Sequence, residues 1–330
     1  DNVTLDFNQN SLTNISNSVY GVVVARNSNN VSIINTFKNL NNLKIDPCNK
    51  KIPYKNSNAN GTINDFLIAG IRVCGRTKYI RIQDIHINQN ISQNLQNNIL
   101  PIRYEDVIDA KLNYGISVGE GDSIGIDMLE TNIQNGVNNL EIKNVFIGGS
   151  IIGVRLISTF NYEIINCDFI NNSYYSLLTG SAFILSNNDS VFNNLCKFGN
   201  ISNCRFVDNQ GKNNNISRPD NNNFFKFFCC LGAYYVDSLI IKSCLFSNNN
   251  SDTNTSIIDV ESSINIVIDG NIIGNSTATN EATLLSGINF SVKRGLLLNS
   301  VLERDFEFVT NENVEIKNTV IQKLFGTNVN

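Results

Sequence analysis

The sequence has few of the residues on which many catalytic and binding sites depend. It contains no tryptophan, and its single histidine is His86. One histidine without a nucleophile-elbow motif excludes a Ser-His-Asp triad. Charged residues make up 16% of the chain, the formal net charge is −4 and there is no basic stripe. This composition argues against a nucleic-acid-binding surface. No apolar run approaches the roughly 18 residues of a transmembrane helix.

The chain does contain a short phrase that recurs eight times. It reads apolar, any, apolar, any, small polar, apolar, any, apolar. Its instances lie at 31–37, 80–87, 140–147, 162–169, 200–206, 239–246, 266–273 and 314–321. Alternating apolar residues predict short strands with one buried and one solvated face. The alternation slips at the small polar residue, which predicts a corner between two strands.

The corner position holds residues that tolerate a left-handed backbone, the conformation of a sharp bend. These residues are Asn35, Asp84, Asn144, Asn166, Asn203, Ser243, Gly270 and Asn318. We also expect asparagine side chains at this corner to hydrogen-bond from one unit to the next.

A third strand precedes most phrases and reads glycine, apolar, any, apolar. The clear instances are 21–24, 70–73, 153–156, 287–290 and 305–308, the last with aspartate in place of glycine. Segment 258–260 fits without its glycine, and 115–118 and 125–128 compete for one place. Three strands per unit predict an all-β parallel β-helix solenoid of about nine coils. The alternative is a sandwich of short antiparallel strands, which gives no reason for asparagine at one corner of every unit.

We expect the whole chain, residues 1–330, to form a single parallel β-helix domain. Loop insertions are predicted near 39–66, 89–114, 171–180, 208–226, 247–256 and 275–286. Most of them precede the glycine-led strand. Because loops gathered on one edge of a solenoid commonly form its binding face, the outward side of that strand is the predicted binding edge.

The eight cysteines show no spacing typical of a metal site. Cys167, Cys204 and Cys244 take the same inward position in three phrases, which is typical of small buried apolar residues. We therefore expect free thiols rather than disulfides, which is compatible with assembly in a reducing compartment.

Segments 60–66 (Asn-Gly-Thr-Ile-Asn-Asp-Phe), 70–73 (Gly-Ile-Arg-Val) and 79–82 (Tyr-Ile-Arg-Ile) resemble the repeat unit of the pectin-lyase-like superfamily of right-handed parallel β-helix proteins. The resemblance covers nearly the whole chain and is architectural. That superfamily includes pectate lyases, polygalacturonases, phage tailspikes, adhesins and non-catalytic virion proteins, and the fold does not choose among them. Sixty of the 330 residues are asparagine, which resembles proteins from AT-rich genomes such as those of some giant viruses.

The resemblance implies a cleft on the sheet of the glycine-led strands. The predicted outward side chains of that sheet are Val23, Arg72, Ser117 or Asp127, Arg155, Asp259, Asn289 and Glu307. Arg72, Asp127 and Arg155 would then be neighbours. Such a row either binds a carboxylated sugar through bidentate hydrogen bonds or forms a surface salt bridge of little consequence.

One interpretation makes the protein a polysaccharide lyase or glycoside hydrolase acting on an acidic glycan, with Asp122, Asp127, Arg72 and Arg155 as implied catalytic residues. Segment 119–126 is similar to a polygalacturonase motif around Asp122, but Gly121 replaces the first of the paired acids and the Gly-His-Gly motif is absent. In a pectate-lyase-like site, Asp122, Asp127 and Glu130 would bind Ca²⁺, and Arg72 or Arg155 would act as the base.

The favoured interpretation is a non-enzymatic structural or adhesin-like β-helix at a virion or cell surface, without a cofactor. The missing Gly-His-Gly, the missing tryptophan and the lone histidine favour it. Its expected partner is a glycan, contacted by Tyr174, Tyr175, Asp259 and Asn289. A second copy or another structural protein is expected at the open coil ends, where strand edges are exposed.

Overall fold

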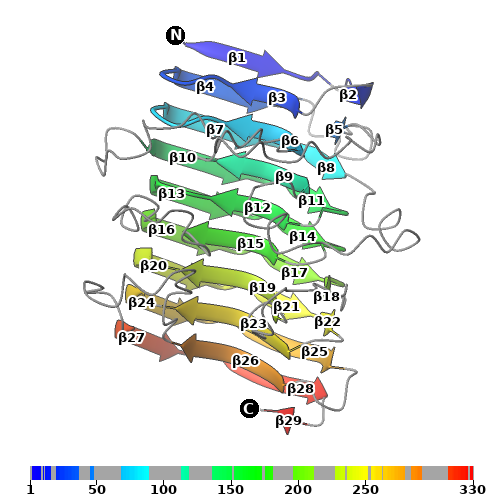
Figure 1. Cartoon of the computed structure of the whole chain (residues 1–330), viewed down its shortest axis with the longest axis vertical. Coiled ribbons are helices and arrows are strands. Elements are labelled where there is room, and N and C mark those ends of the chain that lie inside the picture. The colour runs from blue at the N-terminus through cyan, green and yellow to red at the C-terminus, as the bar shows by residue number, and fades with distance from the viewer. Residues whose placement is uncertain are drawn as a thin grey trace, which may run out of the picture.

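The computed structural model describes residues 2–8, 10, 12–15, 20–36, 45–47, 68–88, 113–118, 136–150, 152–172, 175–180, 196–211, 227–234, 236–251, 254–261, 263–278, 284–291, 311–325 and 328–329. Within these residues every regular element is a β-strand, and all strand pairs are parallel (Figure 1). The described part of the chain contains no helix with the length and apolar character that a membrane span requires.

The described strands form three long sheets and one short pair. Sheet 1 has the order β1 (Val3–Asp6), β4 (Asn29–Ile34), β7 (Lys78–Gln83), β10 (Val137–Lys143), β13 (Thr159–Ile165), β16 (Cys196–Ser202), β20 (Val236–Lys242), β24 (Ile264–Asp269), β27 (Glu312–Lys317). Sheet 2 contains β8 (His86–Asn88), β11 (Phe146–Gly148), β14 (Asp168–Ile170), β17 (Arg205–Val207), β21 (Leu245–Ser247), β25 (Ile272–Ala278), β28 (Val320–Phe325), β22 (Asn250–Ser251) and β18 (Gln210–Gly211). Sheet 3 contains β3 (Tyr20–Val24), β6 (Ile68–Val73), β9 (Asn113–Val118), β12 (Ile152–Leu156), β15 (Tyr175–Gly180), β19 (Phe227–Tyr234), β23 (Asn254–Glu261), β26 (Leu284–Ser291) and β29 (Asn328–Val329). The short pair is β2 (Leu12–Ile15) with β5 (Ile45–Pro47).

Each coil of the chain visits the three sheets in turn. β12 of sheet 3 leads to β13 of sheet 1 and β14 of sheet 2, and β15 then returns to pair with β12. Corresponding strands of successive coils therefore lie one above another (Figure 1). This is a right-handed parallel β-helix, so the predicted fold is confirmed. The antiparallel sandwich is excluded because the described strands pair only in parallel.

Residues in register stack like upon like inside the coils. In sheet 1 one column of mutually paired, buried isoleucines contains Ile33, Ile82, Ile142, Ile164, Ile201, Ile241 and Ile268. In sheet 2 the rings of Phe169, Phe206 and Phe246 stack with centroids 4.7 and 4.6 Å apart. These separations match the distance between neighbouring strands. Each column takes one apolar residue from every coil, and the columns together form a continuous core.

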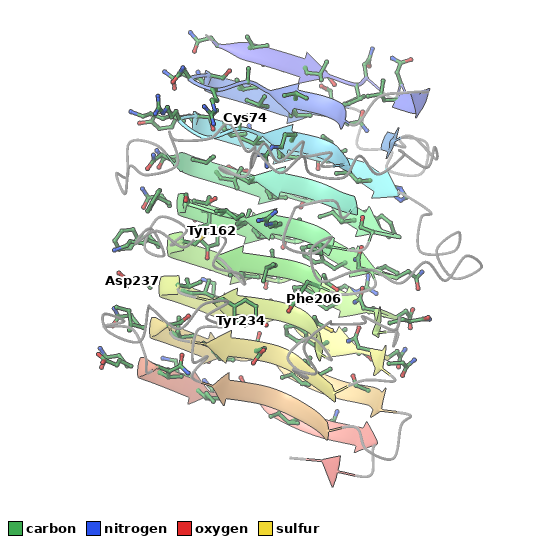
Figure 2. The ribbon with its side chains drawn as sticks, viewed as in Figure 1. Cys74, Tyr162, Phe206, Tyr234 and Asp237 are labelled. Carbon is green, nitrogen blue, oxygen red and sulfur yellow. The ribbon has the colours of Figure 1, made fainter. Side chains whose placement is uncertain are left out.

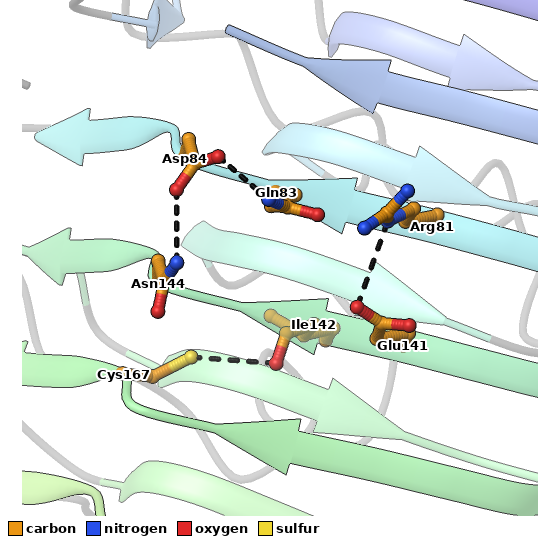
Figure 3. A network of polar contacts seen from close by, with 7 residues as sticks. All are labelled: Arg81, Gln83, Asp84, Glu141, Ile142, Asn144 and Cys167. Atoms are coloured by element: carbon orange, nitrogen blue, oxygen red, sulfur yellow. Dashed lines mark hydrogen bonds and ion pairs between the residues drawn. The ribbon is translucent and has the colours of Figure 1, made fainter. Parts of the chain in front are cut away.

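The corner between sheets 1 and 2 has the predicted backbone. Seven of the eight predicted corner residues have a positive φ, between 50° and 62°. Asn144 donates from Nδ2 to Oδ1 of Asp84 at 3.0 Å (Figure 3), and Asn166 donates to Oδ1 of Asn144 at 3.3 Å. The predicted hydrogen bonding along this corner is confirmed in these coils. Asn35 is the exception, because it is fully buried and is not among the described residues with positive φ.

Sheet 3 decides between the competing strands. β9 contains Gly115–Val118, which takes the place for which 125–128 competed. Strands enter all six predicted insertions, so these segments are not loops throughout. β5 lies within 39–66, the start of β9 within 89–114, β15 within 171–180, β18 within 208–226, β22 and the start of β23 within 247–256, and parts of β25 and β26 within 275–286. β15 has no leading glycine. A buried serine, Ser176, stands in that strand opposite Gly153.

A second asparagine ladder lies inside the coils, at the corner that follows sheet 2. Asn172, Asn209 and Asn249 are fully buried. The backbone N–H of Asn172 donates to Oδ1 of Asn209 at 2.9 Å, and that of Asn209 donates to Oδ1 of Asn249 at 3.1 Å. Their Nδ2 groups donate to backbone carbonyls of the preceding coil at 2.9–3.1 Å. The phrase does not predict this ladder, because these residues fall at or within the expected insertions.

Candidate functional site

The outward face of sheet 3 carries one straight row of residues, one from each of eight successive strands. We call it the outer row. Its members, each the Cα partner of the next, are Val23, Arg72, Ser117, Arg155, Leu178, Gly232, Asp259 and Asn289. The flanking residues on the same strands, such as Val154 and Leu156, are buried in the core. The row between them therefore faces outward, and it runs along the axis of the rod.

The positive charges of the row lie in its first half. Arg72 and Arg155 are two coils apart, with Ser117 between them. Two strand separations place their Cα atoms roughly 10 Å apart. The Arg72 side chain is only 2% exposed, whereas Arg155 is half-buried. A buried guanidinium is held in one orientation, while a half-buried one can still reach a ligand.

The second half of the row contains a carboxyl group, that of Asp259, and a pair of tyrosines lies beside it. The hydroxyl of Tyr234 donates to Oδ2 of Asp259 at 2.9 Å, and the hydroxyls of Tyr175 and Tyr234 are 3.4 Å apart. Their rings meet edge to face with centroids 6.2 Å apart. Asp259 is 3% exposed, and both tyrosines are buried; Tyr234 is labelled in Figure 2. Since the Tyr234 hydroxyl donates its one proton to Asp259, it can accept a hydrogen bond from the Tyr175 hydroxyl.

Gly232 makes room for this cluster. A Cβ atom on Gly232 would lie 2.9 Å from Cε2 of Tyr234, 3.2 Å from Cδ1 of Leu178 and 3.3 Å from Cε1 of Tyr175. Real Cβ atoms almost never come as close as the first of these distances. The glycine therefore lets the two rings and the leucine close over the sheet and hold Asp259 in place.

The structure describes only some of the other predicted site residues. Asp122, Asp127, Tyr174 and Glu307 lie outside the described residues. The backbone of Asn289 pairs with Asp259 at the end of the row. The structure thus brings Arg72, Arg155, Asp259 and Asn289 into one line, with Tyr175 beside them. The roles predicted for these residues stay predictions.

His86 belongs to the packing of sheet 2. It pairs with Phe146 in the neighbouring coil, and the two rings meet edge to face with centroids 4.0 Å apart. It lies half-buried, at the outward position that the phrase predicts. Among the described residues no group of three or more His, Cys, Asp or Glu side chains could hold a metal ion. The expectation of Ca²⁺ under the enzyme interpretation stays open, because its aspartates are not described.

The six cysteines whose side chains the structure describes, Cys74, Cys167, Cys196, Cys204, Cys230 and Cys244, are free thiols, and all but Cys74 are buried. Burial raises the pKa of Cys196 and of Cys230. Hydrogen bonding with the neighbouring thiol of the column, together with burial, raises the pKa of Cys204 and of Cys244. Thiols with raised pKa values stay protonated and are poor nucleophiles. These cysteines therefore serve as core residues, as the sequence predicts.

Three members of the site are not predicted as site residues by the sequence: Leu178, Gly232 and Tyr234. Leu178 falls within a predicted insertion. Tyr234 follows an aromatic run, Phe224–Phe228, that favours a local core patch. The available signal is the segment Leu231-Gly-Ala-Tyr234, in which a glycine stands between two apolar residues of a strand.

No protein-family model matches the chain, and the search of curated proteins gives no match. Several solved structures are similar in overall shape. The surface adhesin PfbA of Streptococcus pneumoniae has 13% identity and a TM-score of 0.45, over 99% of this chain and 68% of that chain. An alginate lyase from Paenibacillus sp. has 11% identity and a TM-score of 0.42, over 94% and 86%. The periplasmic alginate epimerase AlgG has 12% identity and a TM-score of 0.32, over 91% and 69%.

Proposed function

We propose that the protein is a non-enzymatic, adhesin-like β-helix that binds a glycan chain along the outer row. The observation that carries this proposal is the register of sheet 3, which puts Arg72, Arg155 and Asp259 in one column. An extended polysaccharide is linear, as this column of residues is. A row of hydrogen-bonding groups along the rod axis can therefore follow it over several sugars.

The charges of the row favour an acidic glycan. A half-buried guanidinium makes paired hydrogen bonds to a sugar carboxylate, and these charge-assisted bonds are the stronger kind. Arg155 has this exposure and lies between two other members of the row. Asp259 lies three strands further along and is held by Tyr234. Because it is almost fully buried, it would act from beneath the row and not by direct contact with a sugar. An acceptor in that place would disfavour a sugar carboxylate at this end of the row, which fixes the direction in which the chain lies.

The buried carboxyl group of Asp259 is poorly placed for proton transfer. A general base must reach the proton that it removes. Asp259 is almost fully buried and already accepts a hydrogen bond from Tyr234. For this reason we favour recognition of the glycan over its cleavage. Such a rod would act at a cell surface or on a virion, where glycans are met.

The test measures binding and chain scission on the same samples. Alginate, polygalacturonate, hyaluronan, laminarin and galactomannan are titrated by calorimetry with and without Ca²⁺, and their chain lengths are then measured by size-exclusion chromatography. We expect an acidic polymer to bind without scission. Arg155→Ala should weaken that binding by about tenfold or more, because a charge-assisted hydrogen bond contributes about 1.5–3 kcal/mol.

The matched control is Arg205→Ala. Arg205 is exposed on sheet 2 and pairs with Asp168 at 3.4 Å, so its loss removes the same charge from another face. Equal weakening by both variants would reduce the effect to overall charge and overturn the proposed row. Ca²⁺-dependent scission that Arg155→Ala abolishes would instead favour a polysaccharide lyase.

A further inference from the structure

A second row of left-handed residues follows the edge where the strands of sheet 1 begin. Each of the nine strands has one such residue near its start, with φ between 50° and 64°. We call them the left-handed row: Asn2, Asn30, Tyr79, Asn139, Asn161, Phe198, Ser238, Asn265 and Asn313. The strand register sets them directly beside one another from coil to coil.

Two members of this row, Tyr79 and Phe198, are residues that disfavour the left-handed backbone conformation. Asparagine, which fills six of the nine positions, adopts a positive φ readily. Tyr79 and Phe198 are bulky, and a bulky residue with positive φ is strained. The two residues are also 58% and 56% exposed, so burial does little to offset that strain. Packing stability therefore does not account for either aromatic residue.

The two residues between the aromatics are also distinct from the rest of the row. Near its ends the asparagines bond to their neighbours: Asn30 donates to Asn2 at 2.6 Å, and Asn313 donates to Asn265 at 3.0 Å. In the described part of the chain no side-chain hydrogen bond holds Asn139 or Asn161. The middle of the row is thus ring, amide, amide, ring. Three strand separations span roughly 14 Å between the two ring-bearing Cα atoms.

We propose that Tyr79, Asn139, Asn161 and Phe198 form a second glycan-contacting surface, separate from the outer row. Each aromatic face would stack against the C–H face of a pyranose ring. The two amides between them offer both donors and acceptors to sugar hydroxyls. Strained residues that persist without a gain in packing are typical of functional sites. The proposal rests on the proposed function in one respect, which is that the ligand is a glycan.

The test compares thermal stability with glycan affinity, because replacing the aromatic residues should relieve backbone strain and at the same time weaken binding. In Tyr79→Asn, Phe198→Asn and the double variant, asparagine suits the backbone better than the aromatic ring does. We expect the midpoint of thermal unfolding to rise and the affinity to fall by about tenfold or more in the double variant. The probes are the five polysaccharides above, cellohexaose and a single-stranded oligothymidylate. Tyr79→Phe keeps the ring and should keep the affinity.

The matched control is Ser238→Asn, which places asparagine in the same row outside the aromatic pair. It should leave the affinity unchanged. Its effect on the midpoint should be small, because the better backbone fit is offset by loss of the hydrogen bond from Ser238 to Asp237 at 2.8 Å. An unchanged affinity in the double variant would overturn the proposal, as would wild-type protein that binds none of the glycans. Ring-dependent binding of the oligothymidylate alone would also overturn it, since base stacking would then be the role of the rings. If Arg155→Ala loses glycan binding and the double variant keeps it, the result supports binding along the outer row and contradicts binding at the left-handed row.

Discussion

At the scale of single residues, part of the asparagine content has a backbone cause. Fourteen of the 22 described non-glycine residues with positive φ are asparagine. Every coil turns sharply at several points, and asparagine adopts the left-handed conformation with less strain than most residues. The codon bias of an AT-rich genome would raise the asparagine content of the whole chain, but in this fold asparagine recurs at the positions that need a positive φ.

Asp237 gives a prediction at this scale. Burial alone would raise its pKa, but hydrogen bonds from Asn265 and Ser238 and the Lys197 ammonium outweigh burial, so the pKa lies below the ordinary 3.8 (Figure 2). A lowered carboxyl pKa stabilises the fold above the unfolded-state pKa, and this contribution is lost as pH falls through the folded-state pKa. Asp237→Asn should lower the free energy of unfolding by less than about 1 kcal/mol at neutral pH. That difference should vanish in acid below the lowered pKa.

Urea unfolding at neutral and acidic pH measures this difference. Asp208→Asn is the control, because Asp208 is exposed and asparagine equally suits its positive φ. An equal effect of Asp237→Asn at both pH values would contradict the charge-based explanation.

At the scale of elements, the buried asparagine ladder joins successive coils. The side chain of Asn209 donates to the Phe169 carbonyl at 3.1 Å and to Oδ1 of Asn249 at 2.9 Å, and it accepts from the backbone N–H of Asn172 at 2.9 Å. All three asparagines are fully buried. Each partner left without a hydrogen bond in such a place destabilises the fold by about 1–3 kcal/mol.

Asn209→Ala therefore should lower the free energy of unfolding by about 3 kcal/mol or more. Chemical denaturation monitored by far-UV circular dichroism measures this change. Gln210→Ala removes an exposed amide one residue further on and should change stability by less than about 0.5 kcal/mol. Similar effects of the two variants would show that the ladder adds nothing beyond what an exposed amide adds.

At the scale of the whole molecule, the apolar columns of the core reach the surface at both ends of the described stack. Val3 and Leu5 of β1 continue columns whose members in β4 are buried, yet they are 52% and 41% exposed. Ile316 of β27 continues the isoleucine column and is also exposed. A further coil, a second copy or another structural protein would bury these residues.

The predicted association with a second copy is tested by sedimentation velocity. Lys317 and Asp6 end the same column, and hydrogen bonds from Thr36 and Asn8 lower the pKa of Asp6 and keep it charged. Head-to-tail stacking would set these two charges side by side. Leu5→Asp should then abolish concentration-dependent association. Ile240→Asp, at an equally exposed position in mid-rod, should leave it unchanged. A wild-type protein that stays monomeric at all concentrations would contradict the prediction.

How far the sequence predicts the molecule depends on how local each signal is. The corner residues from Asp84 to Asn318 and the sheet 3 strands led by Gly70 and Gly153 are predicted because their signal lies within a few residues. β15 is not predicted, because Ser176 replaces the expected glycine. The tyrosine cluster is not predicted either, since Tyr175 and Tyr234 are 59 residues apart and meet only when two coils stack.

The sequence by itself determined the parallel β-helix, its bends and the inward columns of isoleucine and cysteine. It could do so because a repeated alternation specifies which side of each strand is buried. Only the tertiary structure decided which outward residues share a row, that Ser117 stands between Arg72 and Arg155, and that Asp259 is held by Tyr234. Which outward residues become neighbours depends on the register between strands, and that register exists only after the coils have stacked. The loops between coils differ in length, so the spacing along the sequence does not fix the register.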